Sequence, residues 1–505
     1  MRRAFLVAAV AVATLLAAAW PVAGTPTHAV GSVPKPSPTD RADRIDFNGD
    51  GFDDLAIGVP SEGVGGAAFA GAVNVVYGSP GGLAGTNQVL IQANPEAGDL
   101  FGFAVAKGDF NADGFTDLAV GAPHEDVGGV VLAGAVNVFY GSAAGLPASS
   151  QVRLQANPED SDQFGFALDA GLFNDDNVID LAVGAPGETV GGRRGAGAVS
   201  VFYGSAAGLP ATSQTLLQGN PEPGDNFGAA LVAGFFNADQ GDLAVGAPRE
   251  DVGSAGGAGA VNVFYGTPAG LPAASQVLLQ GNPEVGDQFG SALAAGFFDG
   301  DIWSDLAVGA PTETVGGKAD AGAVSVFFGS VTRLSGTARQ TFVQGAGVGG
   351  TAEAGDNFGA ALAAGPLDTG PSDLAVGAPF EDLGAKADAG AVNVVYGSAT
   401  GLVGRGQVLT QDSPGVAGTA ESGDLFGVAL ARGSFFNNFN GDDFADLAIG
   451  ASGEDVGAKA DAGAVNVQYG SATGLPGTGG QLFTQASAGV AGSAEAGDGF
   501  GSALD

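Results

Sequence analysis

The motif Asp-Leu-Ala-(Val/Ile)-Gly recurs seven times along the chain, and this repetition limits the possible folds more than any other feature. The copies begin at intervals of 62 to 73 residues, at Asp54, Asp117, Asp180, Asp242, Asp305, Asp373 and Asp446. Such a repeat is too long for the unit of a helical solenoid, but it holds four short strands with their turns. It has the content of one blade of a β-propeller.

Each repeat contains four apolar segments separated by turn residues. In the second repeat they cover residues 101–106, 117–121, 135–141 and 151–155. The second and third segments are apolar at both odd and even positions, as expected of strands that are covered on both faces. No segment shows sustained helical periodicity. We therefore predict an all-β fold, a seven-bladed β-propeller.

The two ends of the chain predict how the ring closes. Phe-Gly pairs begin at Phe101, Phe164, Phe227, Phe289, Phe358, Phe426 and Phe500. The first repeat has no such pair before it, and the last pair has no repeat after it. Residues 500–505 should therefore supply the missing strand of blade one, beside residues 45–92. Closure of this kind removes the exposed sheet edges of an open array.

Two motifs of the repeat resemble a known family. Phe-Gly at its start and Gly-Ala-Pro after its second strand, as at residues 121–123, are similar to the FG-GAP repeats of integrin α subunits. The resemblance covers residues 46–505, with departures at residues 58–60 and 450–452 that affect only the edge of the motif. It implies a seven-bladed propeller, calcium in the hairpin loops of some blades, and ligand recognition on the opposite face.

The N-terminal residues have the pattern of an export signal. Arg2 and Arg3 precede an apolar run over residues 4–19, and small residues follow at 22–24. This run is shorter than the roughly 20 residues that span a bilayer. We predict a signal peptide at 1–24, a Pro-rich linker at 25–44 and the propeller at 45–505, in a secreted chain with no membrane span.

Composition favours a binding protein over an enzyme. The chain has 54 acidic and 17 basic residues, which disfavours nucleic acids as partners, and it has no Cys. Its two His, His28 and His124, cannot build a catalytic triad or a zinc site. Two alternatives stay open. One is a carboxylate-dependent hydrolase or lyase acting on polysaccharide or lipid, because a glycosidase needs only two carboxylates; the other is a structural surface component.

Two loops between the first and second segments have the pattern of a calcium-binding hairpin. Oxygen-bearing side chains fall at positions 1, 3, 5 and 9, with Gly at position 6 and a main-chain carbonyl available at position 7. Asp, Asn and Gly also favour ordinary turns, but that preference does not explain four oxygens in register in both loops. The predicted ligands are Asp46, Asn48, Asp50, Phe52 and Asp54 in blade one, and Asp109, Asn111, Asp113, Phe115 and Asp117 in blade two.

The remaining loops depart from this pattern to different degrees. Blade seven is the third calcium candidate, although Asp443 replaces the Gly; its predicted ligands are Asn438, Asn440, Asp442 and Asp446. Blades three and five carry Leu172 and Phe297 at position 1, which favours a bare turn. The loops of blades four and six are shortened, and we expect no ion there.

The opposite rim should carry the ligand site. The residue after Gly-Ala-Pro varies between repeats, and exposed basic and aromatic side chains are typical of binding surfaces. His124, Arg249 and Phe380 are therefore candidates, with drift at a solvated position as the alternative. The Asp before each Phe-Gly recurs in every copy, and we interpret it as a turn cap. We expect a monomer that binds an extracellular protein or glycan.

Overall fold

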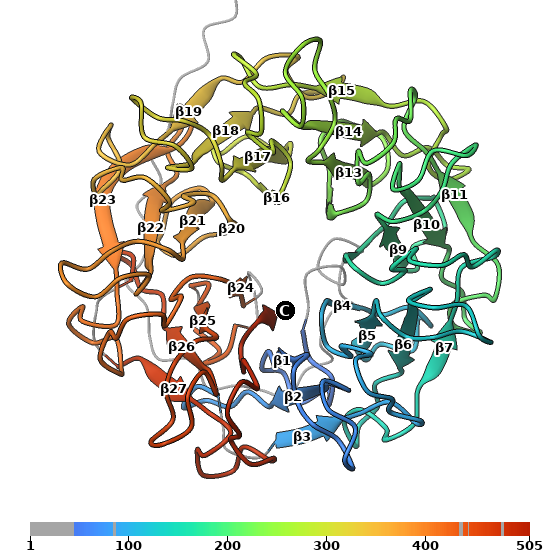
Figure 1. The fold of residues 1–505 in the computed structure, drawn as a ribbon, viewed down its shortest axis with the longest axis horizontal. Coiled ribbons are helices and arrows are strands. Elements are labelled where there is room, and N and C mark those ends of the chain that lie inside the picture. Colours follow the sequence, from blue (N-terminus) through green and yellow to red (C-terminus); the bar gives the residue numbers. More distant parts are fainter. Residues whose placement is uncertain (1–44, 84–86, 434–437, 443, 476–478) are drawn as a thin grey trace, which may run out of the picture. The chain divides into compact units, whose positions relative to one another are not determined.

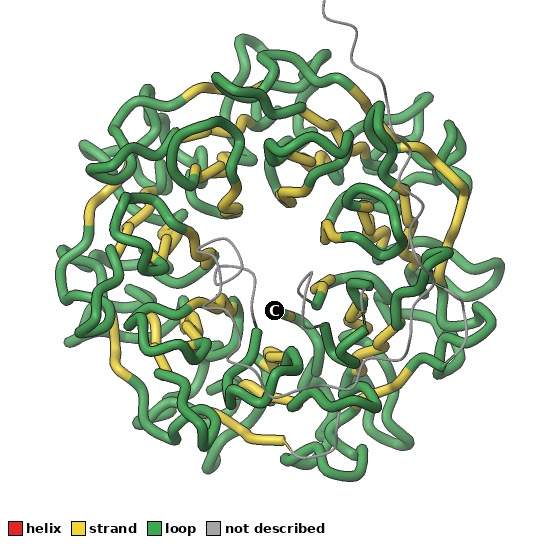
Figure 2. The backbone as a smooth tube through the Cα atoms, turned by 180° about the vertical axis from the view of Figure 1, so that it is seen from behind, coloured by secondary structure: helices red, strands yellow, loops and turns green. Residues whose placement is uncertain are grey.

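The computed structural model describes residues 45–505 apart from 84–86, 434–437, 443 and 476–478. Seven four-stranded antiparallel sheets surround a central opening (Figure 1). All the elements of the described residues are strands, and loops alone connect them (Figure 2). The predicted all-β, seven-bladed propeller is confirmed. The predicted signal peptide at 1–24 and linker at 25–44 lie outside the described residues.

Each blade runs outward from the central opening in four strands. Blades one to three contain β28 (Ala503–Leu504), β1 (Leu55–Val59), β2 (Ala72–Val76) and β3 (Asn87–Leu90); β4 (Val105–Gly108), β5 (Asp117–Ala122), β6 (Ala135–Phe139) and β7 (Gln151–Arg153); and β8 (Leu168–Gly171), β9 (Asp180–Ala185), β10 (Ala198–Phe202) and β11 (Gln214–Leu216). Blades four and five contain β12 (Ala230–Gly234), β13 (Asp242–Ala247), β14 (Ala260–Phe264) and β15 (Gln276–Leu278); and β16 (Ala292–Gly296), β17 (Asp305–Ala310), β18 (Ala323–Phe327) and β19 (Gln340–Phe342). Blades six and seven contain β20 (Ala361–Gly365), β21 (Asp373–Ala378), β22 (Ala391–Tyr396) and β23 (Val403–Leu409); and β24 (Leu430–Arg432), β25 (Leu447–Ala451), β26 (Ala464–Gln468) and β27 (Gln481–Phe483).

The hydrophobic core lies between the blades. Every residue of the second and third strands, such as β5 and β6, is buried. Their side chains meet those of the neighbouring blade in apolar clusters, and one such cluster joins blade seven to blade one through Val465, Leu55 and Ile57. Burial on both faces explains why these strands are apolar at both odd and even positions.

The Phe-Gly motif fastens each blade to the one before it. The Phe101 N–H donates to the Ala70 carbonyl of blade one at 3.0 Å. Next to that carbonyl, Gly71 has φ +85°, and a Cβ there would lie 2.1 Å from the Phe101 carbonyl oxygen. Only glycine fits such an approach. The equivalent glycines are Gly134, Gly197, Gly259, Gly322, Gly390 and Gly463. Because Phe101 is used for this contact, the inner strand begins at Val105, later than predicted.

The C-terminal strand closes the ring as predicted. In β28, Ala503 and Leu504 pair antiparallel with Gly58 and Ile57 of β1. The Phe500 N–H donates to the Ala462 carbonyl of blade seven at 3.0 Å, so this segment links the last blade to the first.

Deletion of residues 500–505 should therefore open the ring, expose the β1 edge of blade one and remove the Phe500 contact with blade seven. We expect the melting temperature to fall by more than about 5 °C, with higher oligomers appearing in size-exclusion chromatography. Removing six residues from the segment 25–44 is the control. A truncated protein that stays monomeric and melts with the parent would contradict closure by β28.

Candidate metal centre and binding rim

The predicted loop of blade one turns its side-chain oxygens back onto its own main chain. The Asp46 carboxylate accepts N–H groups from Asp50 at 3.1 Å and from Gly51 at 2.9 Å. Asn48 Oδ1 accepts the Asp50 N–H at 2.9 Å, and Asp50 Oδ1 accepts the Phe52 N–H at 3.0 Å. Positions 1, 3 and 5 therefore gather around one tight turn.

Blade two repeats this arrangement. The Asp109 carboxylate accepts N–H groups from Asp113 and Gly114, both at 3.0 Å. Asn111 Oδ1 accepts the Asp113 N–H at 2.9 Å, and Asp113 Oδ1 accepts the Phe115 N–H at 2.9 Å. The two loops thus share one local geometry as well as one pattern.

The Asp at position 9 has a different environment. Asp54 is fully buried, and its carboxylate accepts the Gly78 N–H at 3.0 Å and the Phe47 N–H at 2.8 Å. The glycine bond recurs in all seven blades, including those with shortened loops; its other acceptors are Asp117, Asp180, Asp242, Asp305, Asp373 and Asp446. This carboxylate therefore joins the second and third strands whether or not the loop has the calcium pattern.

Both loops bring several carboxyl groups close together. Burial raises the pKa of Asp54 to about 8, backbone N–H donors oppose the rise, and the nearby carboxylates of Asp46 and Asp50 add to it. Burial likewise raises the pKa of Asp117 to about 8, with contributions from its own loop carboxylates. A cation held by such a loop would relieve this repulsion.

Blade seven differs at position 1. The Asn438 amide nitrogen donates to Asp442 Oδ1 at 3.0 Å, to the Asp442 carbonyl at 2.9 Å and to the Phe444 carbonyl. The last of these is the position 7 carbonyl. At position 1 this loop therefore presents an N–H donor to its own oxygens, whereas blades one and two present the carboxylates of Asp46 and Asp109 there.

Within the described parts of the chain, no cluster of three or more His, Cys, Asp or Glu side chains has the arrangement of a metal site. Each of the two loops would hold a cation with two turn carboxylates together with amide and main-chain oxygens. Calcium thus stays a prediction.

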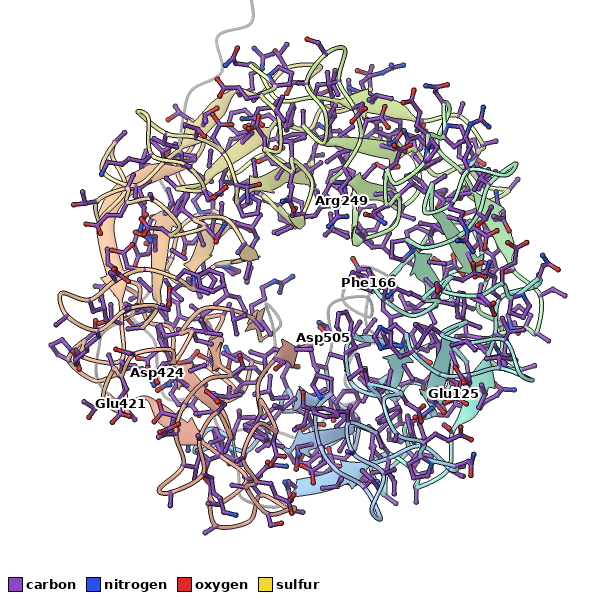
Figure 3. The ribbon with its side chains drawn as sticks, viewed as in Figure 1. Glu125, Phe166, Arg249, Glu421, Asp424 and Asp505 are labelled. Carbon is purple, nitrogen blue, oxygen red and sulfur yellow. The ribbon has the colours of Figure 1, made fainter. Side chains whose placement is uncertain are left out.

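The three predicted rim residues do not form one patch. His124, Arg249 and Phe380 belong to blades two, four and six, so at least one blade intervenes between each pair. The His124 Nε2 atom lies 3.3 Å from the amide nitrogen of Gln163, Arg249 is exposed (Figure 3), and Phe380 is 40% exposed.

Sequence reasoning missed an aromatic pair near the central opening. Phe103 and Phe166 follow the Phe-Gly pairs of blades two and three, and their ring centroids are 4.8 Å apart (Figure 3). The same position in the other blades holds Ala229, Ser291, Ala360, Val428 and Ser502. A comparison of the residue after Phe-Gly between the repeats would have identified the pair, because only two repeats carry an aromatic residue there.

Seven Gln–Glu pairs lie at the junctions between blades, on the rim that carries His124. The Gln92 amide of blade one donates to Glu125 of blade two at 2.9 Å (Figure 3). Burial raises the pKa of Glu125 to about 7, the Gln92 bond opposes the rise, and the Asp99 carboxylate adds to it. The other Gln–Glu pairs are Gln155–Glu188, Gln218–Glu250, Gln280–Glu313, Gln344–Glu381, Gln411–Glu454 and Gln485–Glu62.

The family described as FG-GAP repeat matches residues 45–76, 101–139 and 289–327. These three segments of the chain are therefore FG-GAP repeats. It is 35% identical to bovine phosphatidylinositol-glycan-specific phospholipase D over 167 residues, which are 31% of this chain and 19% of that protein. It is 37% identical to Drosophila melanogaster integrin alpha-PS5 over 149 residues (28% and 14% of the two chains) and 34% identical to human integrin alpha-7 over 146 residues (28% and 12%).

These matches confirm the resemblance to integrin alpha subunits. The chain spans less than a fifth of the length of each of these three relatives. In the part of the chain that the structure describes, no helix has the length and apolar character of a membrane span.

The Gln–Glu pairs predict a pH dependence of stability. Six Glu side chains have a pKa raised from 4.5 to about 7, namely Glu125, Glu188, Glu250, Glu313, Glu381 and Glu454. A raised folded-state pKa contributes stability that is fully present below the unfolded value and is lost as pH rises through the folded value. The melting temperature of metal-free protein should therefore fall between about pH 5 and pH 8.

Combining Glu125→Gln with Glu188→Gln should lessen this fall, because two of the carboxyl groups with a raised pKa are gone. The exposed Asp175, changed to Asn, serves as the control and should leave the slope intact. The same slope in the double variant and the parent would show that these pairs do not set the pH dependence.

Proposed function

We propose that this protein is an exported, calcium-binding, integrin-alpha-like propeller that acts in extracellular binding or cell adhesion. The shared geometry of the loops in blades one and two is the main support for calcium. The similarity to integrin alpha subunits supports a binding role outside the cell. The net charge of −37 favours cations and basic surfaces as partners.

The donor set of the two loops fits calcium. Carboxylate, amide and carbonyl oxygens are the ligands that this hard cation takes. Asp46, Asn48, Asp50 and the carbonyl of Phe52 would hold the ion in blade one, with Asp54 completing the predicted set. In blade two the corresponding residues are Asp109, Asn111, Asp113, Phe115 and Asp117. A bound ion supplies positive charge that offsets the crowded carboxylates and fixes the turn.

The two loops contact each other, so an ion in either one would stabilise the junction between their blades. Thr116 of blade two donates its N–H to the Asp46 carbonyl at 3.2 Å and accepts the Asp46 N–H at its hydroxyl at 3.2 Å. The Phe115 ring lies over Gly49, where a Cβ would come 2.6 Å from it. In blade seven the Asn438 amide already meets the loop oxygens. We therefore rank blade seven below blades one and two as a calcium site.

The ligand rim is proposed on the face opposite the loops. Arg249 and Phe380 are exposed there, and His124 is partly buried beside Gln163. An extracellular protein or glycan would use such scattered anchors over a broad surface more readily than one pocket.

A hydrolase acting on lipid is the second candidate function. It is favoured by the similarity to phosphatidylinositol-glycan-specific phospholipase D, although the matched segment is 19% of that enzyme. Against it, the recurrent buried acids bond to backbone N–H groups or to Gln side chains in blade after blade, which is the behaviour of structural carboxylates.

Calcium should raise the melting temperature. Because the loop geometry belongs to the folded state, each site should add about 2.7 kcal/mol when free ion is 100 times the dissociation constant. Changing both Asp50 and Asp113 to Ala should remove most of the difference between calcium and chelator in differential scanning calorimetry. Asp239→Ala in the shortened loop of blade four is the control. Identical melting curves in calcium and in chelator would show that these loops are turns that bind no calcium.

Binding without turnover is the expected behaviour. We expect purified protein to bind members of an extracellular protein and glycan array, and Arg249→Ala or Phe380→Ala to weaken that binding by roughly tenfold. The same protein should leave inositol-glycan lipids and polysaccharides uncleaved. Cleavage that one carboxylate substitution abolishes would replace the adhesion proposal with the hydrolase.

A further inference from the structure

The strands nearest the central opening break the repeat on one side of the ring. In blades four to six they read ALVAG, ALAAG and ALAAG, without a charged residue. In the four successive blades seven, one, two and three the same segment carries Arg432, Asp505, Lys107 and Asp169. The two acids are the fifth residue after the Phe of Phe-Gly, and the two basic residues are the sixth. All four side chains line one cavity of about 660 Å³.

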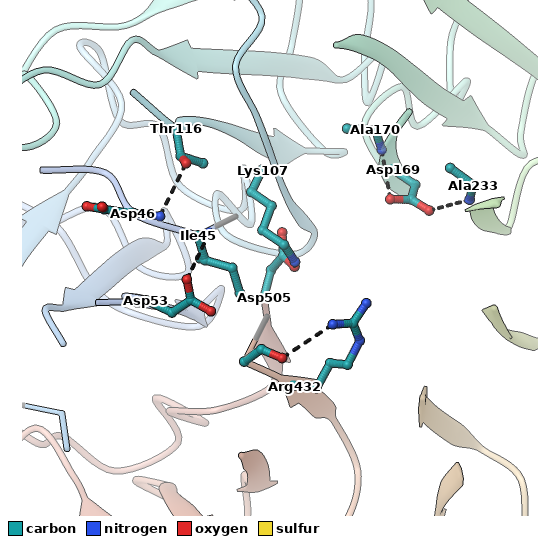
Figure 4. A network of polar contacts seen from close by, with 11 residues as sticks. Ile45, Asp46, Asp53, Lys107, Thr116, Asp169, Ala170, Ala233, Arg432 and Asp505 are labelled. Carbon is teal, nitrogen blue, oxygen red and sulfur yellow. Dashed lines mark hydrogen bonds and ion pairs between the residues drawn. The ribbon is translucent and has the colours of Figure 1, made fainter. Parts of the chain in front are cut away.

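The charged wall contains two cations and two anions. Lys107 forms an ion pair with Asp505, and their side chains are 20% and 19% exposed (Figure 4). The Asp169 carboxylate accepts N–H groups from Ala170 at 2.7 Å and from Ala233 at 2.6 Å, and the Arg432 guanidinium donates to the Gly433 carbonyl at 3.3 Å. Partial burial strengthens the attraction of these groups for a charged ligand, because the surroundings screen less than bulk water.

The opposite wall is apolar. Val232, Leu293 and Leu362 come from the inner strands of blades four to six, and Phe235 and Phe297 come from the loops that follow in blades four and five. Phe297 leaves 42% of its surface exposed.

These aromatic side chains also explain a feature of the loops. Phe235 and Phe297 occupy position 1, where blades one and two carry Asp46 and Asp109. In blades four and five the first calcium ligand has thus been replaced by a residue that lines the cavity.

We propose that this cavity binds a small zwitterion with an apolar body, that is, an apolar amino acid or a short peptide with free termini. The ammonium group would meet Asp169 and Asp505, the carboxylate would meet Arg432 and Lys107, and the apolar side chain would face Phe297. The wall presents side chains of both signs, so a ligand that carries both signs complements it better than a simple ion. The volume lies in the range of about 300 to 1,000 Å³ typical of small-molecule sites. The proposal does not depend on the calcium loops or the rim.

The dipeptide Leu-Phe is a suitable probe, titrated calorimetrically into the full chain. N-acetyl-Leu-Phe and Leu-Phe-amide each lack one terminal charge, and we expect each to bind at least about tenfold more weakly. Arg432→Gln and Asp169→Asn should each weaken Leu-Phe by a similar factor. Arg333→Gln, which makes the same change of charge at an exposed position outside the cavity, is the control.

The Arg432→Gln variant allows a sharper comparison. Without the guanidinium, amidation of the peptide should cost far less affinity than it does in the parent, a pattern that general damage to the fold would not produce. No binding heat at about 10 mM Leu-Phe would overturn the proposal. Equal affinity for the blocked peptides, or for sodium octanoate, would also overturn it, because a neutral or simply anionic ligand would then suffice.

Discussion

The buried aspartate at the start of each second strand is the contact on which the blade depends. Asp54 accepts the N–H of Gly78, beyond the third strand, and that of Phe47, in the preceding loop. Removing this acceptor would leave buried N–H groups unpaired, at a cost of roughly 1–3 kcal/mol for each. Because the bond from the glycine recurs in all seven blades, it accounts for the Asp of the repeated motif without reference to metal.

Main-chain bonds between successive loops then connect the blades into a ring. The Thr116 N–H donates to the Asp46 carbonyl, and the Asp53 N–H donates to the Asn438 carbonyl at 3.3 Å, which carries the series across the closing junction. Equivalent bonds join Ile179 to Asp109, Gly241 to Leu172, Ser304 to Phe235, Ser372 to Phe297 and Ala445 to Pro366. The first residue of every candidate loop is therefore part of the ring, so metal binding and ring stability should be coupled.

The repeat and its unmatched ends were sufficient to predict the propeller and its closure, because period and strand pairing are visible in sequence. The directions in which the side chains point are not visible in the sequence. Asp46 and Asp54 share one spacing pattern, yet Asp54 faces the third strand, and Asn438 turns its amide nitrogen onto its own loop. The sequence also left Arg432 and Lys107 unremarked, because deviation from the repeat was sought in loops and not along the inner strands.

The number of calcium ions bound per chain tests the central claim most directly, and native mass spectrometry measures it. Two loops have matched turn geometry, so we expect two ions in the parent and one after Asp50→Ala or Asp113→Ala alone. A count of zero in the parent, or a count that neither substitution changes, would contradict the assignment of calcium to blades one and two.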